Sequence, residues 1–198
     1  MDNRSLLHGH LIAIATIFLV LSSALLLSNG VNNSSVLLSL RVSSLTTALP
    51  FLLVFAMQPM QRFQVTRKTG QWAQQHFRDL WVIAAISHLI HLAQLGLYYQ
   101  LGQSCPPLIW AVTTPVWIIL GLFAAISIFQ PGWFSPRPRP QKALLYEVGS
   151  WYVWLVFTVA FSLGSAAHHL LFYNLPAASL FVAAAVLRWL PHKQTSAY

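Results

Sequence analysis

Six long apolar runs set the strongest constraint on how this chain can fold. Crossing the hydrocarbon core of a bilayer takes roughly 20 apolar residues, and each run meets or approaches that length. Backbone polar groups in lipid must pair within the segment, so each run is expected to form a helix. The runs cover about residues 9–28, 36–58, 80–100, 107–129, 148–173 and 175–190. The sequence therefore predicts an all-α polytopic membrane protein, a six-transmembrane-helix bundle that forms a single domain over residues 1–198.

The composition excludes several other classes of protein. Only 7% of the residues are charged and 57% are hydrophobic, whereas a soluble domain carries about 25% charged residues. Cys105 is the single cysteine in the chain, which excludes an internal disulfide framework and any metal site built from several cysteines. There is no glycine-rich phosphate loop and no Ser/His/Asp set, so the sequence predicts neither a nucleotide domain nor a hydrolase.

The positions of the basic residues predict the orientation of the helices. If the six runs alternate across the membrane, ten of the eleven Lys and Arg residues fall on the side of the N-terminus, and Arg41 falls on the other. The ten are Arg4, Arg62, Arg67, Lys68, Arg78, Arg137, Arg139, Lys142, Arg188 and Lys193. By the positive-inside rule both termini are expected in the cytoplasm. The net charge of +8 is then explained by topology and by anionic lipid head groups, not by nucleic acid.

Two of the predicted helices each carry a pair of histidines. His88 and His91 stand three residues apart on the third run and share a face, and His168 and His169 are adjacent on the fifth run,. A polar ring inside a membrane is costly unless it has a partner. The third and fifth helices run in the same direction, and imidazole is a good axial ligand for tetrapyrrole iron. We therefore expect a cofactor between these helices, with His91 and His168 as iron ligands and His88 or His169 as alternate or supporting groups.

Arg41 is the lone basic residue expected on the periplasmic side, at the start of the second run. One interpretation is that its guanidinium reaches the lipid head groups while its stem lies in the apolar region. The other is that it pairs with a heme propionate, because guanidinium groups bind carboxylates strongly.

The segment from Thr46 to Gly102 resembles the ferric-reductase-like transmembrane family. The motifs are Thr-Ala-Leu-Pro-Phe-Leu-Leu at 47–53, Gln-Pro-Met-Gln-Arg-Phe at 58–63, and Phe-Arg-Asp-Leu-Trp at 77–81, which leads into His91. Within that family the chain is similar to the heme-binding membrane subunits of bacterial periplasmic methionine sulfoxide reductase systems. Those subunits are six-helix b-type cytochromes of the inner membrane, which take electrons from a cytoplasmic flavin reductase or from quinol.

The resemblance implies which histidines hold the heme. The family's third-helix ligand falls on His91, and its late fifth-helix ligand falls on His168 or His169. The family's earlier histidine on the fifth helix falls at Leu155 or Val156 in this sequence. The resemblance therefore implies one heme b and does not support a second.

These features together predict a b-type heme protein that transfers electrons toward a periplasmic acceptor in the bacterial inner membrane. Such a chain would be the electron-transfer subunit of an oxidoreductase and needs a protein partner, since it has no nucleotide domain; quinone is a further candidate partner. Two alternatives stay open. The chain could be a structural or accessory subunit of a larger membrane complex, or the same histidines could bind a tetrapyrrole pigment or another metal.

Overall fold

The computed structural model describes residues 3–28, 30–61, 63, 65–130, 133, 140–167 and 171–190, without the side chains of 3–9, 140, 164–167 and 171–173. Within these ranges the chain forms seven helices and no strand. The helices are α1 (Asn3–Leu27), α2 (Asn33–Met60), α3 (Arg67–Gln75), α4 (Phe77–Gln100), α5 (Pro107–Phe129), α6 (Pro140–Ala167) and α7 (Leu171–Trp189). The expected all-α class is confirmed over the residues described.

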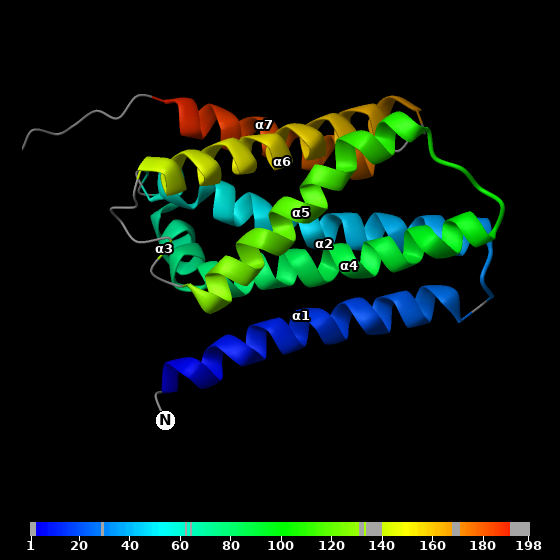
Figure 1. Ribbon diagram of the computed structural model, residues 1–198, viewed down its shortest axis with the longest axis horizontal. Helices are drawn as coiled ribbons and strands as arrows, with labels where there is room; N and C mark the ends of the chain where they lie inside the picture. Colours follow the sequence, from blue (N-terminus) through cyan, green and yellow to red (C-terminus); the bar gives the residue numbers. More distant parts are fainter. Residues whose placement is uncertain are drawn as a thin grey trace, which may run out of the picture.

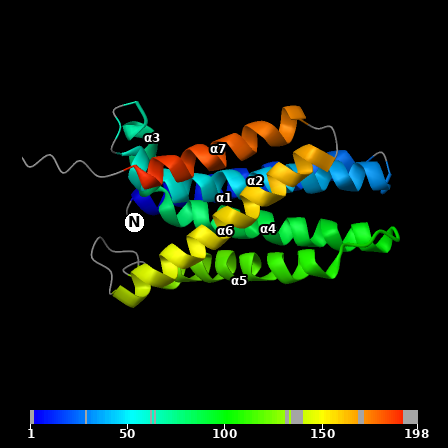
Figure 2. The same ribbon diagram turned by 90° about the horizontal axis from the view of Figure 1, so that it is seen from above.

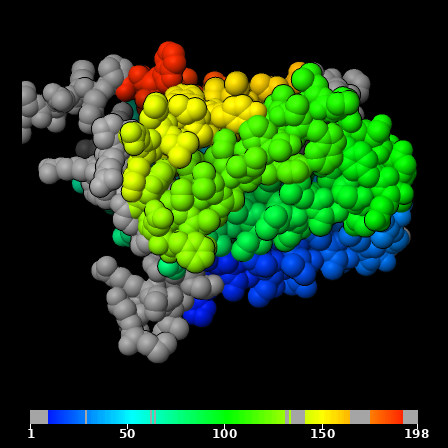
Figure 3. Space-filling model, in the orientation of Figure 1, coloured from blue at the N-terminus to red at the C-terminus, as the bar shows by residue number. Residues whose placement is uncertain are grey.

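The six long helices run side by side, and α2 and α4 form the centre of the bundle (Figure 1). α1 packs against α2 and α4 on one side, and α6 and α7 pack against each other and against α2 on the other. α5 contacts α4 and α6, and it crosses obliquely over this face of the molecule (Figure 3). The two central helices therefore touch almost every other element, and residues on them can share a site with any layer.

Both ends of the described chain lie at the same end of the bundle, together with the short helix α3 (Figures 1 and 2). We call this the α3 end. α2 runs toward it and α4 starts from it, while the α1–α2 and α4–α5 connections lie at the opposite end (Figure 1). Six long helices return the chain to its starting side, so the basic α3 region shares an end with the first and last described residues.

Five helices are long and apolar enough to cross a membrane in the part of the chain that the structure describes. The segments are His10–Leu27, Asn33–Met60, Phe77–Gln100, Pro107–Phe129 and Gln141–Leu163, and Asn174–Trp189 is a shorter apolar helix. Large apolar side chains cover the outside of these helices; Leu25 on α1 is 73% exposed, for example. These features are typical of a multi-pass membrane protein.

Several helix boundaries differ from the sequence expectation. The segment between the second and third predicted runs is not a plain loop, because it contains α3. Gly70 of α3 lies flat against α2, where a Cβ atom would stand 2.8 Å from the Met57 carbonyl oxygen. The fifth long helix spans 140–167 rather than about 148–173. The sixth begins at Leu171 rather than near 175, with Pro176 inside it. A proline near a helix start forfeits one backbone hydrogen bond without ending the helix.

A polar contact of Arg188 joins α7 to α2 near the α3 end. Pro59 has no N–H, so the Phe55 carbonyl of α2 lacks its usual helical donor. Arg188 Nη1 donates to that carbonyl oxygen at 3.3 Å, and its guanidinium stacks over the Phe55 ring at 4.4 Å. Arg188 also pairs with Glu147 on α6. The proline defect in α2 thus becomes an attachment point for α7.

Interlocking aromatic rings fill the bundle toward the α3 end. Phe51 is fully buried, and its ring centroid lies 5.8–6.3 Å from those of four other rings. Rings at such distances add specific packing energy to the area they bury. We call this set the aromatic core; its members are Phe51, Phe55, Trp81, Phe123, Phe157, Phe161 and Phe181.

Candidate functional site

A cavity of about 210 Å³ lies between five helices, next to the aromatic core. Its lining comes from α2, α4, α5, α6 and α7. The lining residues are Arg41, Ser44, His88, His91, Thr113, Val116, Val156, Phe157, Ala160, Phe161 and Asn174. We call it the histidine cavity. It combines two imidazoles, a guanidinium and several hydroxyl or amide groups with apolar walls.

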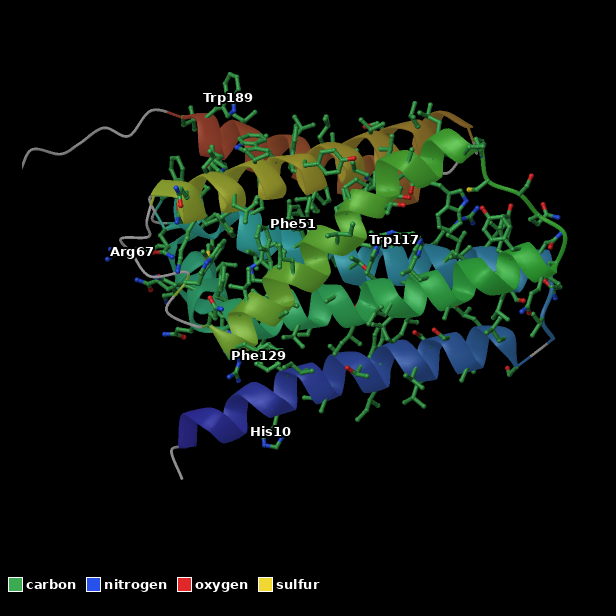
Figure 4. The ribbon with its side chains drawn as sticks, in the orientation of Figure 1. His10, Phe51, Arg67, Trp117, Phe129 and Trp189 are labelled. Atoms are coloured by element: carbon green, nitrogen blue, oxygen red, sulfur yellow. The ribbon has the colours of Figure 1, made fainter. Side chains whose placement is uncertain are left out.

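His88 and His91 reach the cavity from the same face of α4. They are three residues apart, which places them one above the other on a helix. Their rings lie 5.7 Å apart between centroids and are nearly parallel, at 9°. The His88 ring also meets the edge of Trp117 from α5, with 6.0 Å between centroids. Trp117 therefore marks the position of the site in Figure 4, farther from the α3 end than Phe51.

The Nε2 atom of His88 is buried and has no hydrogen-bond partner in the described structure. A buried polar atom without a partner costs free energy, roughly 1–3 kcal/mol. Since the side chain lines a cavity, a bound group could supply the missing interaction. His88 is in this respect the most conspicuous polar residue of the site.

His91 is held from behind by side chains of α2. Its Nδ1 atom lies 2.9 Å from Ser43 Oγ and 3.4 Å from Ser44 Oγ. Ser43 is fully buried and also donates to Gln94 Oε1 at 2.6 Å. Metal-binding histidines commonly have their second ring nitrogen fixed by such a hydrogen bond. The geometry leaves His91 Nε2 as the nitrogen available to a ligand.

Arg41 brings positive charge to the same cavity from α2, one turn before Ser44. It is the only residue with a permanent charge among the lining residues of the described structure. A side chain in this position can meet an anionic group bound in the cavity, which is compatible with the propionate interpretation,. Both interpretations of Arg41 stay predictions.

The wall opposite α4 carries no imidazole among the residues described. α6 contributes Val156 and Ala160 there, and α7 contributes Asn174. His168 and His169 lie outside the described residues, so their place relative to His91 stays a prediction. Val156 occupies one of the two positions at which the resembling family has its earlier fifth-helix histidine, and a valine offers no ligand atom.

The described residues contain no group of three or more His, Cys, Asp or Glu side chains that could hold a metal ion. The histidine cavity supplies two imidazoles from one helix turn, which cannot bind opposite faces of one flat macrocycle. A bis-histidine site would need its second ligand from elsewhere. Within the described structure the cavity can hold an anionic or metal-containing group only from the α4 and α2 side.

Two residues of the site were not singled out from the sequence. Ser43 and Gln94 hold His91 in place, and both are fully or almost fully buried. Gln94 stands three residues after His91, and Ser43 belongs to a polar stretch of the second run that also includes Arg41 and Ser44. Polar residues inside a predicted span mark functional sites by default, so this signal was present.

None of the protein-family models, curated proteins or solved structures with which the chain was compared matches it. The resemblance to the ferric-reductase-like family accordingly stays a prediction.

Proposed function

We propose that this chain is a membrane-embedded b-type heme protein that passes electrons toward an acceptor at the end of the bundle opposite α3. His91 is the proposed axial ligand from α4, and His168 or His169 is the proposed ligand from the segment after α6. His88 is a supporting or alternate ligand, and Arg41 is the proposed partner of a propionate. The chain would then be the electron-transfer subunit of an oxidoreductase, with a divergent kinship to the ferric-reductase-like family.

The observation that carries this proposal is the meeting of His88, His91 and Arg41 in the lining of one cavity between the helices. Iron takes imidazole nitrogen as an axial ligand, and a guanidinium suits the carboxylates of the same cofactor. The unpartnered Nε2 of His88 adds a buried polar atom that calls for a bound group,. Whereas His91 bonds Ser43 of α2, His88 Nε2 bonds no neighbouring helix within the described structure.

The imidazole and guanidinium groups of the cavity suit an iron tetrapyrrole, but the cavity is small for such a cofactor. Pockets that bury drug-sized ligands usually measure about 300–1,000 Å³, and the histidine cavity has about 210 Å³. Binding would therefore require the lining side chains to move apart. Ala160 is the smallest of them and offers room on the α6 side.

The chain's own residues would set the properties of the bound group. When bound, heme supplies one-electron redox chemistry. Ser43 fixes the His91 ring at Nδ1, and the apolar aromatic core lies beside the cavity. Hydrogen bonding to the ligand and apolar surroundings are two factors that tune iron potentials. The sequence contains no glycine-rich phosphate loop; we propose that a donor and an acceptor protein, or a quinone, exchange electrons with the chain.

The proposed topology has six spans and both termini in the cytoplasm of a bacterial inner membrane. α7 has 19 residues, which at 1.5 Å per residue gives about 28 Å, close to the ~30 Å hydrocarbon core. The described basic residues Arg67, Lys68, Arg78, Lys142 and Arg188 occupy segments at the α3 end (Figure 1), as the positive-inside rule requires of a cytoplasmic side. A fluorescent protein fused to the C-terminus is expected to fluoresce if that terminus is cytoplasmic. The opposite orientation would be indicated by a full-length fusion that does not fluoresce, together with an active alkaline phosphatase fused at the same place.

The decisive experiment is the absorption spectrum of the purified protein, oxidised and then reduced with dithionite. A sharp reduced α-band of the b type is expected. His91→Ala is expected to lower heme occupancy at least tenfold, while the matched variant His10→Ala, whose side chain is exposed on α1, keeps it. Arg41→Gln is expected to keep some heme and to change its midpoint potential.

Other outcomes would select the alternatives. Far-red bands would identify a pigment, and metal analysis without a heme band would identify another metal site. A featureless spectrum with no bound metal would refute the cofactor proposal and favour an accessory subunit, in which the histidines serve helix packing. An unchanged heme content in both His91→Ala and His168→Ala would refute the assignment of ligands.

A further inference from the structure

A chain of four hydrogen-bonded side chains crosses three helices and ends at His91. Ser23 on α1 accepts from Gln94 Nε2 at 2.9 Å, Gln94 Oε1 accepts from Ser43 at 2.6 Å, and Ser43 Oγ lies 2.9 Å from His91 Nδ1. Gln94 is 4% exposed and Ser43 is fully buried. Hydrogen bonds of this kind are worth most where water cannot compete.

The direction of each bond in this chain follows from counting hydrogens. A hydroxyl carries one hydrogen, and three groups surround Ser43 Oγ: Gln94 Oε1, His91 Nδ1 and the Leu40 carbonyl oxygen, the last at 3.0 Å. The two oxygens can only accept, so one of them takes the Ser43 hydrogen. If His91 Nδ1 were also an acceptor, one hydrogen would face three acceptors. Ser43 is satisfied when His91 Nδ1 carries a proton and donates to it.

The distances support this orientation of the Gln94 amide. A separation of 2.6 Å is usual for O–H···O and short for N–H···O, so the oxygen of Gln94 faces Ser43 and its nitrogen faces Ser23. The Leu40 carbonyl has a second donor, because Ser44 Oγ donates to it at 2.7 Å. Each of the three bonds then joins a donor to an acceptor.

We infer that Ser43 and Gln94 are positioning residues that hold His91 as its Nδ1–H tautomer and present the Nε2 lone pair to the histidine cavity. A neutral imidazole with a free Nε2 lone pair can bind a transition-metal ion or accept a hydrogen bond. That the ligand is heme iron rests on the proposed function; the assignment of the tautomer does not.

The same chain gives α1 a part in the site. Leu19 is the one fully buried apolar side chain of α1 among its described side chains, and most others face outward. The bond between Gln94 and Ser23 is thus a specific polar link from this outer helix to α4. Through Gln94 and Ser43 it connects α1 to His91.

The test is ¹⁵N NMR of the full-length, heme-free protein in lipid nanodiscs, with labelled histidine. Protonated and unprotonated ring nitrogens have well-separated shifts, and His91 is assigned by the signal lost in His91→Gln. We expect a proton on Nδ1 in the unmodified protein. In Ser43→Ala/Ser44→Ala, which removes both hydroxyls beside Nδ1, the ratio of Nδ1–H to Nε2–H is expected to fall about tenfold, as the loss of a buried hydrogen bond predicts.

Matched variants keep the inference falsifiable if one of them folds poorly. Ser43→Thr retains the hydroxyl and should retain the tautomer, and Gln94→Leu should give an intermediate ratio. Ser39→Ala removes another buried hydroxyl of α2 that has no partner in the described structure, and it should change nothing. An Nε2–H tautomer in the unmodified protein, or an unchanged ratio in the double variant, would overturn the inference.

A second measurement separates this inference from the proposed function. In heme-loaded protein, loss of the hydrogen bond to Nδ1 makes the ligand a weaker donor, so Ser43→Ala should raise the midpoint potential while Ser39→Ala leaves it unchanged. A protein that shows the expected tautomer but no heme spectrum would refute heme binding alone. If the protein binds heme but the His91 tautomer ratio is unchanged when Ser43 is replaced, only the positioning role is refuted.

Discussion

The aromatic core and the histidine cavity are built from the same helices, yet they are held together in different ways. In the aromatic core, rings from α2, α4, α5, α6 and α7 fill the interior, and no member is more than 8% exposed. In the histidine cavity the same helices leave about 210 Å³ open, and polar contacts join the walls. One half of the bundle is filled and the other is hollow.

The difference shows where this fold can accommodate function. Ring packing stabilises the filled half, as expected in a membrane, where tight van der Waals contact replaces the hydrophobic effect between helices. In the hollow half, bonds such as Ser43–His91 and Trp110–Tyr99 hold α2, α4 and α5 together. An open cavity lined by several polar groups is costly to maintain,, so the filled half supplies the stability on which it depends.

The largest effect is expected from truncating the centre of the aromatic core. Phe51→Ala removes a ring in contact with four others and should lower the free energy of unfolding by about 3–5 kcal/mol. The measurement is a denaturant titration in detergent micelles. Phe129→Ala, at an 80% exposed position, is the control and should cost less than about 0.5 kcal/mol. Similar losses in both variants would mean that the core is not closely packed.

The next largest effect is expected from enlarging an alanine, which should destabilise the filled half more than the hollow half. Ala84 is fully buried in the apolar cluster that contains the aromatic core, so Ala84→Leu should cost about 1–3 kcal/mol through overpacking. Ala160 lines the histidine cavity, so Ala160→Leu should cost less than about 1 kcal/mol because space is available. The second variant should also lower heme occupancy. If Ala160→Leu were the more destabilising of the two, the hollow description of that half would be wrong.

The smallest effect concerns a polar contact between α4 and α5. Trp110 Nε1 donates to the Tyr99 hydroxyl at 2.6 Å, and Tyr99→Phe should cost about 0.5–1.5 kcal/mol. Tyr98→Phe is the matched control, since the Tyr98 hydroxyl has no hydrogen bond within the described structure. Thermal unfolding followed by circular dichroism compares the two; equal melting temperatures would indicate that hydrogen bonds do not hold this half together.

Much of the helix content could be predicted from residues close together in the chain. The range expected for the fourth run, 107–129, is that of α5. The spacing of His88 and His91 also predicted a shared face, and their parallel rings confirm it. The helix α3 within segment 61–77 was not predicted, because it depends on Gly70 fitting closely against α2. No pattern of neighbouring residues indicates that contact.

The sequence by itself determined which segments can be helices in a membrane, because length and polarity decide that locally. Only the tertiary structure decided which side chains meet. Ser43 and His91 are 48 residues apart, and Gln94 and Ser23 are 71 residues apart. Their contact depends on how each helix is rotated and tilted against its neighbours. Helix rotation results from packing over the whole bundle, so the histidine cavity, unlike the helices around it, is a property of the assembled fold.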